Sequence, residues 1–167
     1  EDLDGRIWCG TNLGVFVIED ATRYFDNDFR FEQIKISRND GSGLADYLLN
    51  GVAISCITVD GANRKWIGTH TNGLYLISAD GTEMLHHFTT SDSPLISNAI
   101  QCVAVHPTTG VVMIGTDMGL CSYTADATEA AEEMDADDVL VYPNPVKPDY
   151  NGTIAVRGLS MDAEVKI

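Results

Sequence analysis

The chain has 167 residues, of which 44% are hydrophobic, so it is long enough for one globular domain with an appendage. Its formal net charge of −15 excludes electrostatic attraction to nucleic acid or to an anionic membrane surface. No apolar run approaches the ~18 residues of a membrane span, and no signal peptide is recognisable. Because the chain begins in the middle of a repeat, at Glu1-Asp2-Leu3-Asp4, we expect it to be a piece of a longer polypeptide.

One sequence pattern occurs three times in the first 123 residues, at 4–18, 60–77 and 109–123. Each copy has two short apolar segments joined by a tight polar turn, which is the pattern of a β-hairpin. A Gly-Thr pair ends the first segment of every copy, and its glycine recurs at Gly10, Gly68 and Gly115. A strand repeat of this length favours β-propeller blades.

Large side chains share one position of the repeat, which Trp8, Trp66 and Met113 occupy. Such side chains suit the space between stacked blades, so we interpret both tryptophans as inter-blade core rather than as ligand contacts. The glycine two residues later is expected to allow close approach of a neighbouring backbone.

The four cysteines, Cys9, Cys56, Cys102 and Cys121, have no metal-binding or redox spacing. Each lies where a strand is expected to place a core residue, and Cys121 matches Phe16 and Tyr75 of the other copies. We therefore interpret them as small buried hydrophobes. A disulfide is the less favoured alternative.

In chain order, the pattern predicts an all-β protein, a partial propeller of about three blades over residues 1–124. Blade one is expected to lack its inner strand, and blade three its outer strand. Connections rich in turn residues are expected near 38–51 and 91–98. The predicted strands are 6–11, 15–19 and 30–37 in blade one, 53–59, 64–69, 74–78 and 83–89 in blade two, and 99–105, 111–116 and 120–124 in blade three.

The second copy reads Asp60-Gly61, then Trp66-Ile67-Gly68-Thr69, a turn, and Gly73-Leu74-Tyr75. This form resembles the two-component-regulator propeller repeat, which is typical of bacterial cell-envelope proteins. The resemblance covers roughly residues 1–123. It implies a periplasmic or cell-surface location, associated with the outer membrane.

The last part of the chain changes character after residue 124. Residues 125–138 contain seven acidic side chains and no base, so we expect an acidic linker. Residues 139–167, with Tyr142-Pro143-Asn144-Pro145 and predicted strands at 153–157 and 164–167, resemble the start of the C-terminal sorting domain of type IX secretion cargo. That resemblance implies a truncated immunoglobulin-like sandwich. Together with the propeller it looks like a PorZ-like surface component of that secretion system.

No catalytic motif is present: the chain has no Gly-x-Ser-x-Gly elbow, no phosphate-binding glycine loop and no His-Glu-x-x-His. His86 and His87 alternate on a predicted strand, so their rings are expected on opposite faces and do not share a metal. The acidic turns 26–28 and 39–41 do not follow the EF-hand pattern. We therefore expect no enzymatic activity, no metal site and no cofactor.

A ligand site, if present, is expected where the hairpin turns and the blade connections gather on one face of the propeller. Loops on a rigid scaffold often carry binding groups. Ordinary polar turn residues are the simpler interpretation, and the favoured one. The candidate ligand-binding residues are Asn12, Arg38, Asp46, Tyr47, His70, Asn72, Asn98 and Asp117.

Two functions remain open. The first is a non-enzymatic binding module of a surface or periplasmic protein that recognises lipopolysaccharide, another glycan or a protein, as the resemblance to type IX secretion components implies. The alternative is the periplasmic oligosaccharide-sensing propeller of a hybrid two-component regulator. We also expect the chain to associate with itself, because incomplete end blades expose apolar faces and unpaired strand edges.

Overall fold

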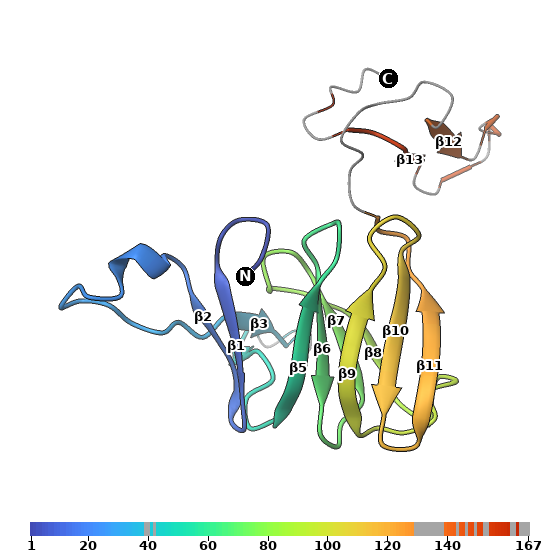
Figure 1. Ribbon diagram of the computed structural model, residues 1–167. Helices are drawn as coiled ribbons and strands as arrows, with labels where there is room; N and C mark the ends of the chain where they lie inside the picture. Colours follow the sequence, from blue (N-terminus) through green and yellow to red (C-terminus); the bar gives the residue numbers. More distant parts are fainter. Residues whose placement is uncertain are drawn as a thin grey trace. The chain divides into compact units, whose positions relative to one another are not determined.

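The computed structural model describes residues 1–38, 41, 43–128, 139–142, 144–145, 147–148, 150–151, 154–160 and 163 (Figure 1). The chain divides into two compact units, Glu1–Thr128 and Glu129–Ile167. The described part is all-β, apart from a single 3-10 turn at Ala21–Arg23 (η1). Among the described residues no helix has the length and apolar character needed to cross a membrane.

Three antiparallel sheets stack in chain order in the first unit and form propeller-like blades (Figure 1). The predicted all-β propeller class is therefore confirmed. The bounds of these strands agree with the prediction to within one residue at each end. Their strands are β1 (Ile7–Thr11) and β2 (Gly14–Ile18) in blade one, β5 (Ile54–Val59), β6 (Lys65–Thr69), β7 (Leu74–Ile77) and β8 (Met84–Phe88) in blade two, and β9 (Ile100–Val105), β10 (Val111–Thr116) and β11 (Gly119–Thr124) in blade three.

The repeated glycine is what allows the blades to approach one another. A Cβ atom at Gly10 would lie 2.5 Å from Ile54 Cγ2, and one at Gly68 would lie 2.7 Å from Ile100 Cγ2. Because an isoleucine at the start of each inner strand sits against the glycine of the preceding blade, any larger residue there would push the blades apart. The predicted close approach of a neighbouring blade is confirmed at Gly10 and Gly68, whereas Gly115 lies against Cys102 of its own blade.

The tryptophans lie between blades, as predicted. Trp8 is 8% exposed in the core between blades one and two, and Trp66 is fully buried in the core between blades two and three. Met113, at the same repeat position, is 37% exposed, so the prediction of a wedged core residue is wrong there. The physical reason is that no described strand packs on that face of blade three.

The cysteines are all free, and one of them contradicts the prediction of burial. Cys9, Cys56 and Cys121 are partly buried, whereas Cys102 is exposed. Cys102 pairs with Gly115 on the same face of blade three as Met113. This end face (Cys102, Ala104, Met113, Leu120 and Ser122) corresponds by register to the face that blade two buries against blade three.

Thiol labelling of the folded chain is expected to modify Cys102 well before Cys56. Burial raises the pKa of the Cys56 thiol, which leaves less of the reactive thiolate at a given pH. Brief iodoacetamide treatment followed by peptide mass spectrometry measures both rates, with Cys102→Ser as the control that removes the fast site. Equal rates at the two cysteines would contradict the packing of blade two against blade three.

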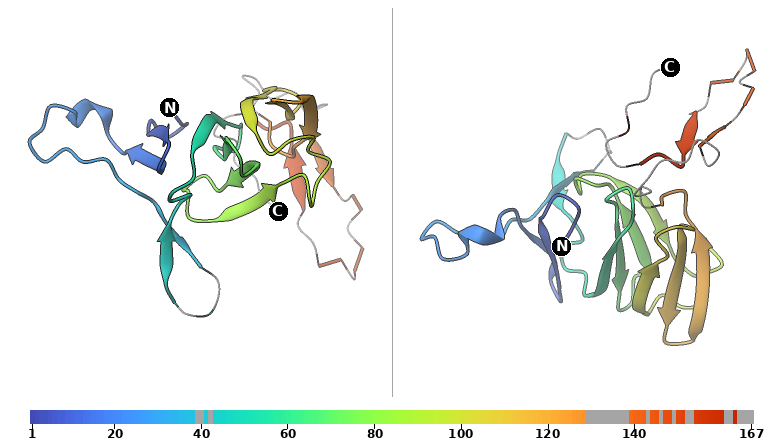
Figure 2. Two further views of the ribbon diagram at one scale, coloured as in Figure 1. Left: turned by 90° about the horizontal axis from the view of Figure 1, so that it is seen from below. Right: turned by 45° about the horizontal axis from the view of Figure 1, so that its top comes forward.

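The predicted outer strand 30–37 is mostly wrong. Only Lys35–Ser37 forms a strand (β3), and it pairs with Ala45–Tyr47 (β4) rather than with β2. One bridge, Val17 to Glu32, is the backbone pairing that the described part of this segment makes with β2. The reason is local pairing: the turn-rich connection folds back, and β4 provides the hydrogen-bond partners of β3. Figure 2 shows the β3–β4 hairpin extending sideways from the blades.

The second unit contains one described strand pair, Leu140–Tyr142 (β12) with Ala155–Arg157 (β13), antiparallel. β13 falls within the predicted strand 153–157. The predicted strand 164–167, most of the predicted acidic linker 125–138, and residues Asn39 and Asp40 of the predicted acidic turn lie outside the described residues.

Candidate functional site

The hairpin turns of the three blades lie at the same end of their strands, the lower end in Figure 1. Backbone hydrogen bonds tie the turns of blades two and three to the connections that enter those same blades. His70 N–H donates to the Ala53 carbonyl, and Asp117 N–H donates to the Ala99 carbonyl. The structure therefore brings five predicted residues to one turn end: Asn12, His70, Asn72, Asn98 and Asp117.

Besides the backbone bonds of His70 and Asp117, two more of these five residues, Asn98 and Asn72, have structural partners. Asn98 is half-buried; its carbonyl accepts from Gly73 N–H, and its side-chain Oδ1 accepts from Thr90 N–H at 2.9 Å. The Asn72 carbonyl lies 2.7 Å from Nε2 of His87. Asn98 is therefore part of the scaffold, whereas the exposed side chains of Asn12, His70 and Asp117 are accessible to a ligand.

The other three predicted residues lie on the β3–β4 hairpin and its ends, away from the turns of blades two and three (Figure 2). Arg38 Nε donates to Asp46 Oδ2 at 2.8 Å, and both side chains are largely exposed. Tyr47 is also exposed. An exposed ion pair of this kind contributes little to stability. Arg38, Asp46 and Tyr47 thus form a separate surface.

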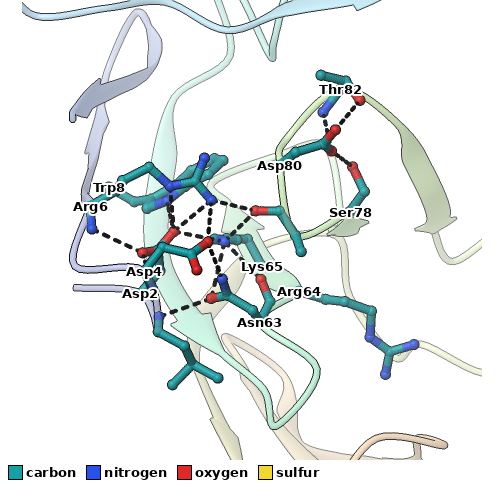
Figure 3. A network of polar contacts seen from close by, with 12 residues as sticks. Asp2, Asp4, Arg6, Trp8, Asn63, Arg64, Lys65, Ser78, Asp80 and Thr82 are labelled. Atoms are coloured by element: carbon teal, nitrogen blue, oxygen red, sulfur yellow. Dashed lines mark hydrogen bonds and ion pairs between the residues drawn. The ribbon is translucent and has the colours of Figure 1, made fainter. Parts of the chain in front are cut away.

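Sequence reasoning missed a buried polar network between blades one and two, centred on Asp2 (Figure 3). The Asp2 carboxylate accepts from Trp8 Nε1 at 2.8 Å and from the Arg6 side chain at 3.0 Å. It also accepts from the backbone N–H groups of Asp4 and Arg6. Lys65 Nζ lies 2.9 Å from the same carboxylate, and the side chains of Asp2 and Lys65 are fully buried.

Lys65 joins the two blades because its ammonium contacts groups of both. Nζ donates to the Ala79 carbonyl at 2.6 Å and to the Asn63 carbonyl at 2.7 Å. It also lies 4.7 Å from the centre of the Trp8 ring, within the range of a cation–π contact. A buried charge requires such pairing. These contacts make the network a structural clamp rather than a ligand site.

Blade two repeats the central part of this network. Asp60 accepts from Trp66 Nε1 at 3.1 Å and from Arg64 Nε at 2.8 Å. The spacing from aspartate to arginine to tryptophan is the same in Asp2, Arg6 and Trp8. This Asp-x-x-x-Arg-x-Trp pattern is the sequence signal from which the network could have been predicted. It also shows that the structural equivalent of Asp60 is Asp2 and not Asp4.

The hydrogen bonds of the network set the protonation of Asp2. Burial alone would raise the pKa of this carboxyl, but hydrogen bonds from Lys65, Trp8 and Arg6 outweigh burial and hold the pKa well below its ordinary value of 3.8. Asp2 is therefore a carboxylate throughout the physiological range of pH.

The free energy of unfolding is expected to fall as the pH drops from about 5 to about 2. A carboxyl whose folded pKa is depressed stabilises the fold above its unfolded pKa, near 3.8, and this stability is lost as the pH falls through the folded pKa. Asp80 adds to the effect, because hydrogen bonds led by the Ser78 hydroxyl lower its pKa to about 2. Urea denaturation at several pH values measures the slope, which Asp2→Asn is expected to flatten.

An apolar pocket of about 130 Å³ lies between blades two and three, beside β11. Its walls are aromatic and aliphatic, with the Trp66 ring 5.8 Å from that of Tyr123. The lining residues are Trp66, Phe88, Ser93, Pro94, Leu95, Ile114, Cys121, Ser122 and Tyr123. Within the described residues, no group of three or more His, Cys, Asp or Glu side chains is placed to hold a metal ion.

No protein-family model matches this chain, and no curated protein matches it. Solved structures do match. PorZ, an essential surface component of the type-IX secretion system of Porphyromonas gingivalis, is 32% identical, with a TM-score of 0.70 over 95% of this chain and 21% of its own.

Two extracellular domains from B. thetaiotaomicron also match. The extracellular domain of the hybrid two component system candidate BT3049 is 22% identical, with a TM-score of 0.54. The match covers 93% of this chain and 19% of that one. The extracellular domain of the one component system candidate BT4673 is 17% identical, with a TM-score of 0.55. The match covers 84% of this chain and 20% of that one. These two likenesses concern the fold alone. The chain spans about a fifth of the length of each solved chain that it matches.

Proposed function

We propose that this chain is part of a non-enzymatic binding module of a bacterial cell-surface or periplasmic protein, of the kind found in the type IX secretion system. The likeness to PorZ, at 32% identity over 95% of the chain, carries the proposal. The pattern Tyr142-Pro143-Asn144-Pro145 supports it, because it resembles the start of a type IX sorting domain. In this proposal residues 1–124 are the propeller segment, 125–138 the linker and 139–167 the start of that domain.

The turn end is the proposed ligand surface. Its exposed predicted side chains are amide, imidazole and carboxylate groups, Asn12, His70, Asn72 and Asp117. Such groups donate and accept hydrogen bonds with hydroxyls, and none is a permanent cation. This chemistry suits the neutral sugars of a glycan, including those of a lipopolysaccharide, better than phosphate groups, which favour Arg and Lys. A protein partner is the other ligand class that we propose.

The test is titration calorimetry of the whole chain with O-polysaccharide released from purified lipopolysaccharide. The variant Asn12→Ala/His70→Ala/Asp117→Ala removes three exposed turn side chains and is expected to abolish the binding. Glu83→Ala, an exposed change at the opposite end of blade two, is the matched control. Absence of binding, or equal binding by the triple variant, would reject glycan recognition at the turn end.

A periplasmic oligosaccharide-sensing propeller of a hybrid two-component regulator is the alternative function. The fold match to the extracellular domain of BT3049 favours it. The flanking coding sequence separates the two functions: a kinase region after residue 167 would select the sensor, and a completed sorting domain would select the secretion component.

A further inference from the structure

The hairpin turn of blade two, residues 70–73, is fixed to the outer strand of its own blade. Nε2 of His87, on β8, lies 2.7 Å from the Asn72 carbonyl oxygen. Because a carbonyl oxygen only accepts hydrogen bonds, this nitrogen carries the proton and donates it. The next residue of β8 also contacts the turn, since a Cβ atom at Gly73 would collide with the Phe88 carbonyl oxygen. Two successive residues of β8 therefore hold the turn.

The repeat shows why this turn has an additional anchor. In all three blades the threonine of the Gly-Thr pair accepts from the N–H of the residue before the turn glycine, as Thr69 Oγ1 does from Asn72 at 2.8 Å. Blade two has three residues between threonine and glycine, whereas blades one and three have two. A longer turn has more backbone freedom to lose. The bond from His87 restrains the last residue of this longer turn.

The restrained residue is also the polar one at its position of the repeat. Blades one and three have Leu13 and Met118 before the turn glycine, and these aliphatic side chains are 69% and 74% exposed. Among these three positions, only Asn72 has a side chain that both donates and accepts hydrogen bonds. The orientation of its amide therefore decides which hydroxyl groups the centre of the turn end can bind.

Two further contacts orient the Asn72 side chain. The Thr71 hydroxyl donates to Asn72 Oδ1 at 2.8 Å. Burial raises the pKa of Tyr75, and a hydrogen bond with the Asn72 side chain partly offsets the rise. The Tyr75 ring in turn stacks on the His87 ring, with the ring centres 3.9 Å apart. His87 therefore acts on Asn72 both directly, through the hydrogen bond, and indirectly, through Tyr75.

We propose that His87 is a positioning residue of the ligand surface at the turn end: its Nε2–H holds the Asn72 carbonyl and so presents the Asn72 amide to a glycan. The inference rests on the proposed function and deepens it, because His87 lies outside the turn and was not among the predicted ligand-binding residues. The hydrogen bond is the positioning contact, and the ring stack on Tyr75 supports it.

Two substitutions separate the hydrogen bond from the ring contact. His87→Gln keeps an N–H donor but loses the ring, whereas His87→Phe keeps a ring beside Tyr75 but loses the donor. Titration calorimetry of the whole chain with the released O-polysaccharide is expected to show about fivefold to tenfold weaker binding for His87→Phe and less than about twofold for His87→Gln. His86→Phe, the same change at the exposed neighbouring position of β8, is the matched control and is expected to bind like the wild type.

Amide hydrogen exchange measured by NMR reports on the turn without any ligand. The N–H groups of Asn72 and Gly73 donate to Thr69 Oγ1 and to the Asn98 carbonyl. Both are expected to exchange at least about fivefold faster in His87→Phe, because local opening becomes easier when the anchor is lost. Exchange in His87→Gln and in His86→Phe is expected to match the wild type.

Equal exchange in the wild type and His87→Phe would overturn the proposal, whatever the chain binds. Exchange in His87→Gln as fast as in His87→Phe would also overturn it, since the ring contact alone would then order the turn. Faster exchange in His87→Phe with unchanged glycan affinity would reject the role in binding. If the wild type binds no O-polysaccharide, glycan recognition fails, and faster exchange in His87→Phe alone still supports the positioning of Asn72 by His87.

Discussion

Replacing Lys65 with methionine is expected to lower the free energy of unfolding by about 3–5 kcal/mol. The substitution keeps an unbranched side chain of similar length but removes the charge. The Asp2 carboxylate, fully buried 2.9 Å from Lys65 Nζ, would then keep only the Arg6 side chain as a cationic partner. The Ala79 and Asn63 carbonyls would lose a donor as well. Breaking one half of a buried pair is costly because the other half remains buried with less compensation.

Urea denaturation of the whole chain measures this loss, with Arg23→Met as the matched control. Arg23 also pairs with two carboxylates, Asp26 and Asp28, but on the surface, so its removal is expected to leave the urea midpoint unchanged. Adding Asp2→Asn to Lys65→Met removes the buried negative charge and is expected to restore part of the stability. A Lys65→Met variant as stable as the wild type would contradict the clamp between blades one and two.

Much of the propeller was predictable because its signals are local and repeated. The glycine of each Gly-Thr pair and the apolar residues around it specify both a hairpin and a close contact between blades. This is why strand bounds such as those of β10 match the prediction. Burial was predictable at Trp8 and Trp66 for the same reason. It failed at Met113 and Cys102, because the repeat pattern describes a face and not whether another blade covers it.

The polar contacts were less predictable. From sequence alone, a lysine side chain is expected to be exposed to solvent. Only the fold shows that Lys65 is buried against Asp2, a residue 63 positions earlier in the chain. Likewise, Arg38 and Asp46 were grouped with the turns because connections and turns share a face in a regular blade. The β3–β4 hairpin separates them from that face by pairing with itself. Sequence spacing alone does not show which residues distant in the chain pair with one another.

Replacing Trp66 with alanine is expected to cost about 3–5 kcal/mol of unfolding free energy, as for other fully buried large side chains. Trp66 has no exposed surface, and its ring stacks 6.0 Å from that of Phe88. Its truncation would leave a cavity across the core between blades two and three. The indole donor to Asp60 would be lost as well.

Met113→Ala is the matched control, because Met113 occupies the same repeat position on a face that no described strand covers. Its truncation is expected to cost less than about 1 kcal/mol. Urea denaturation at two protein concentrations compares the two variants. If Met113→Ala costs as much as Trp66→Ala at high concentration but not at low concentration, the end face of blade three is buried between copies in solution. Such a result would support the predicted self-association, whereas a small and concentration-independent loss would leave the end face open to solvent.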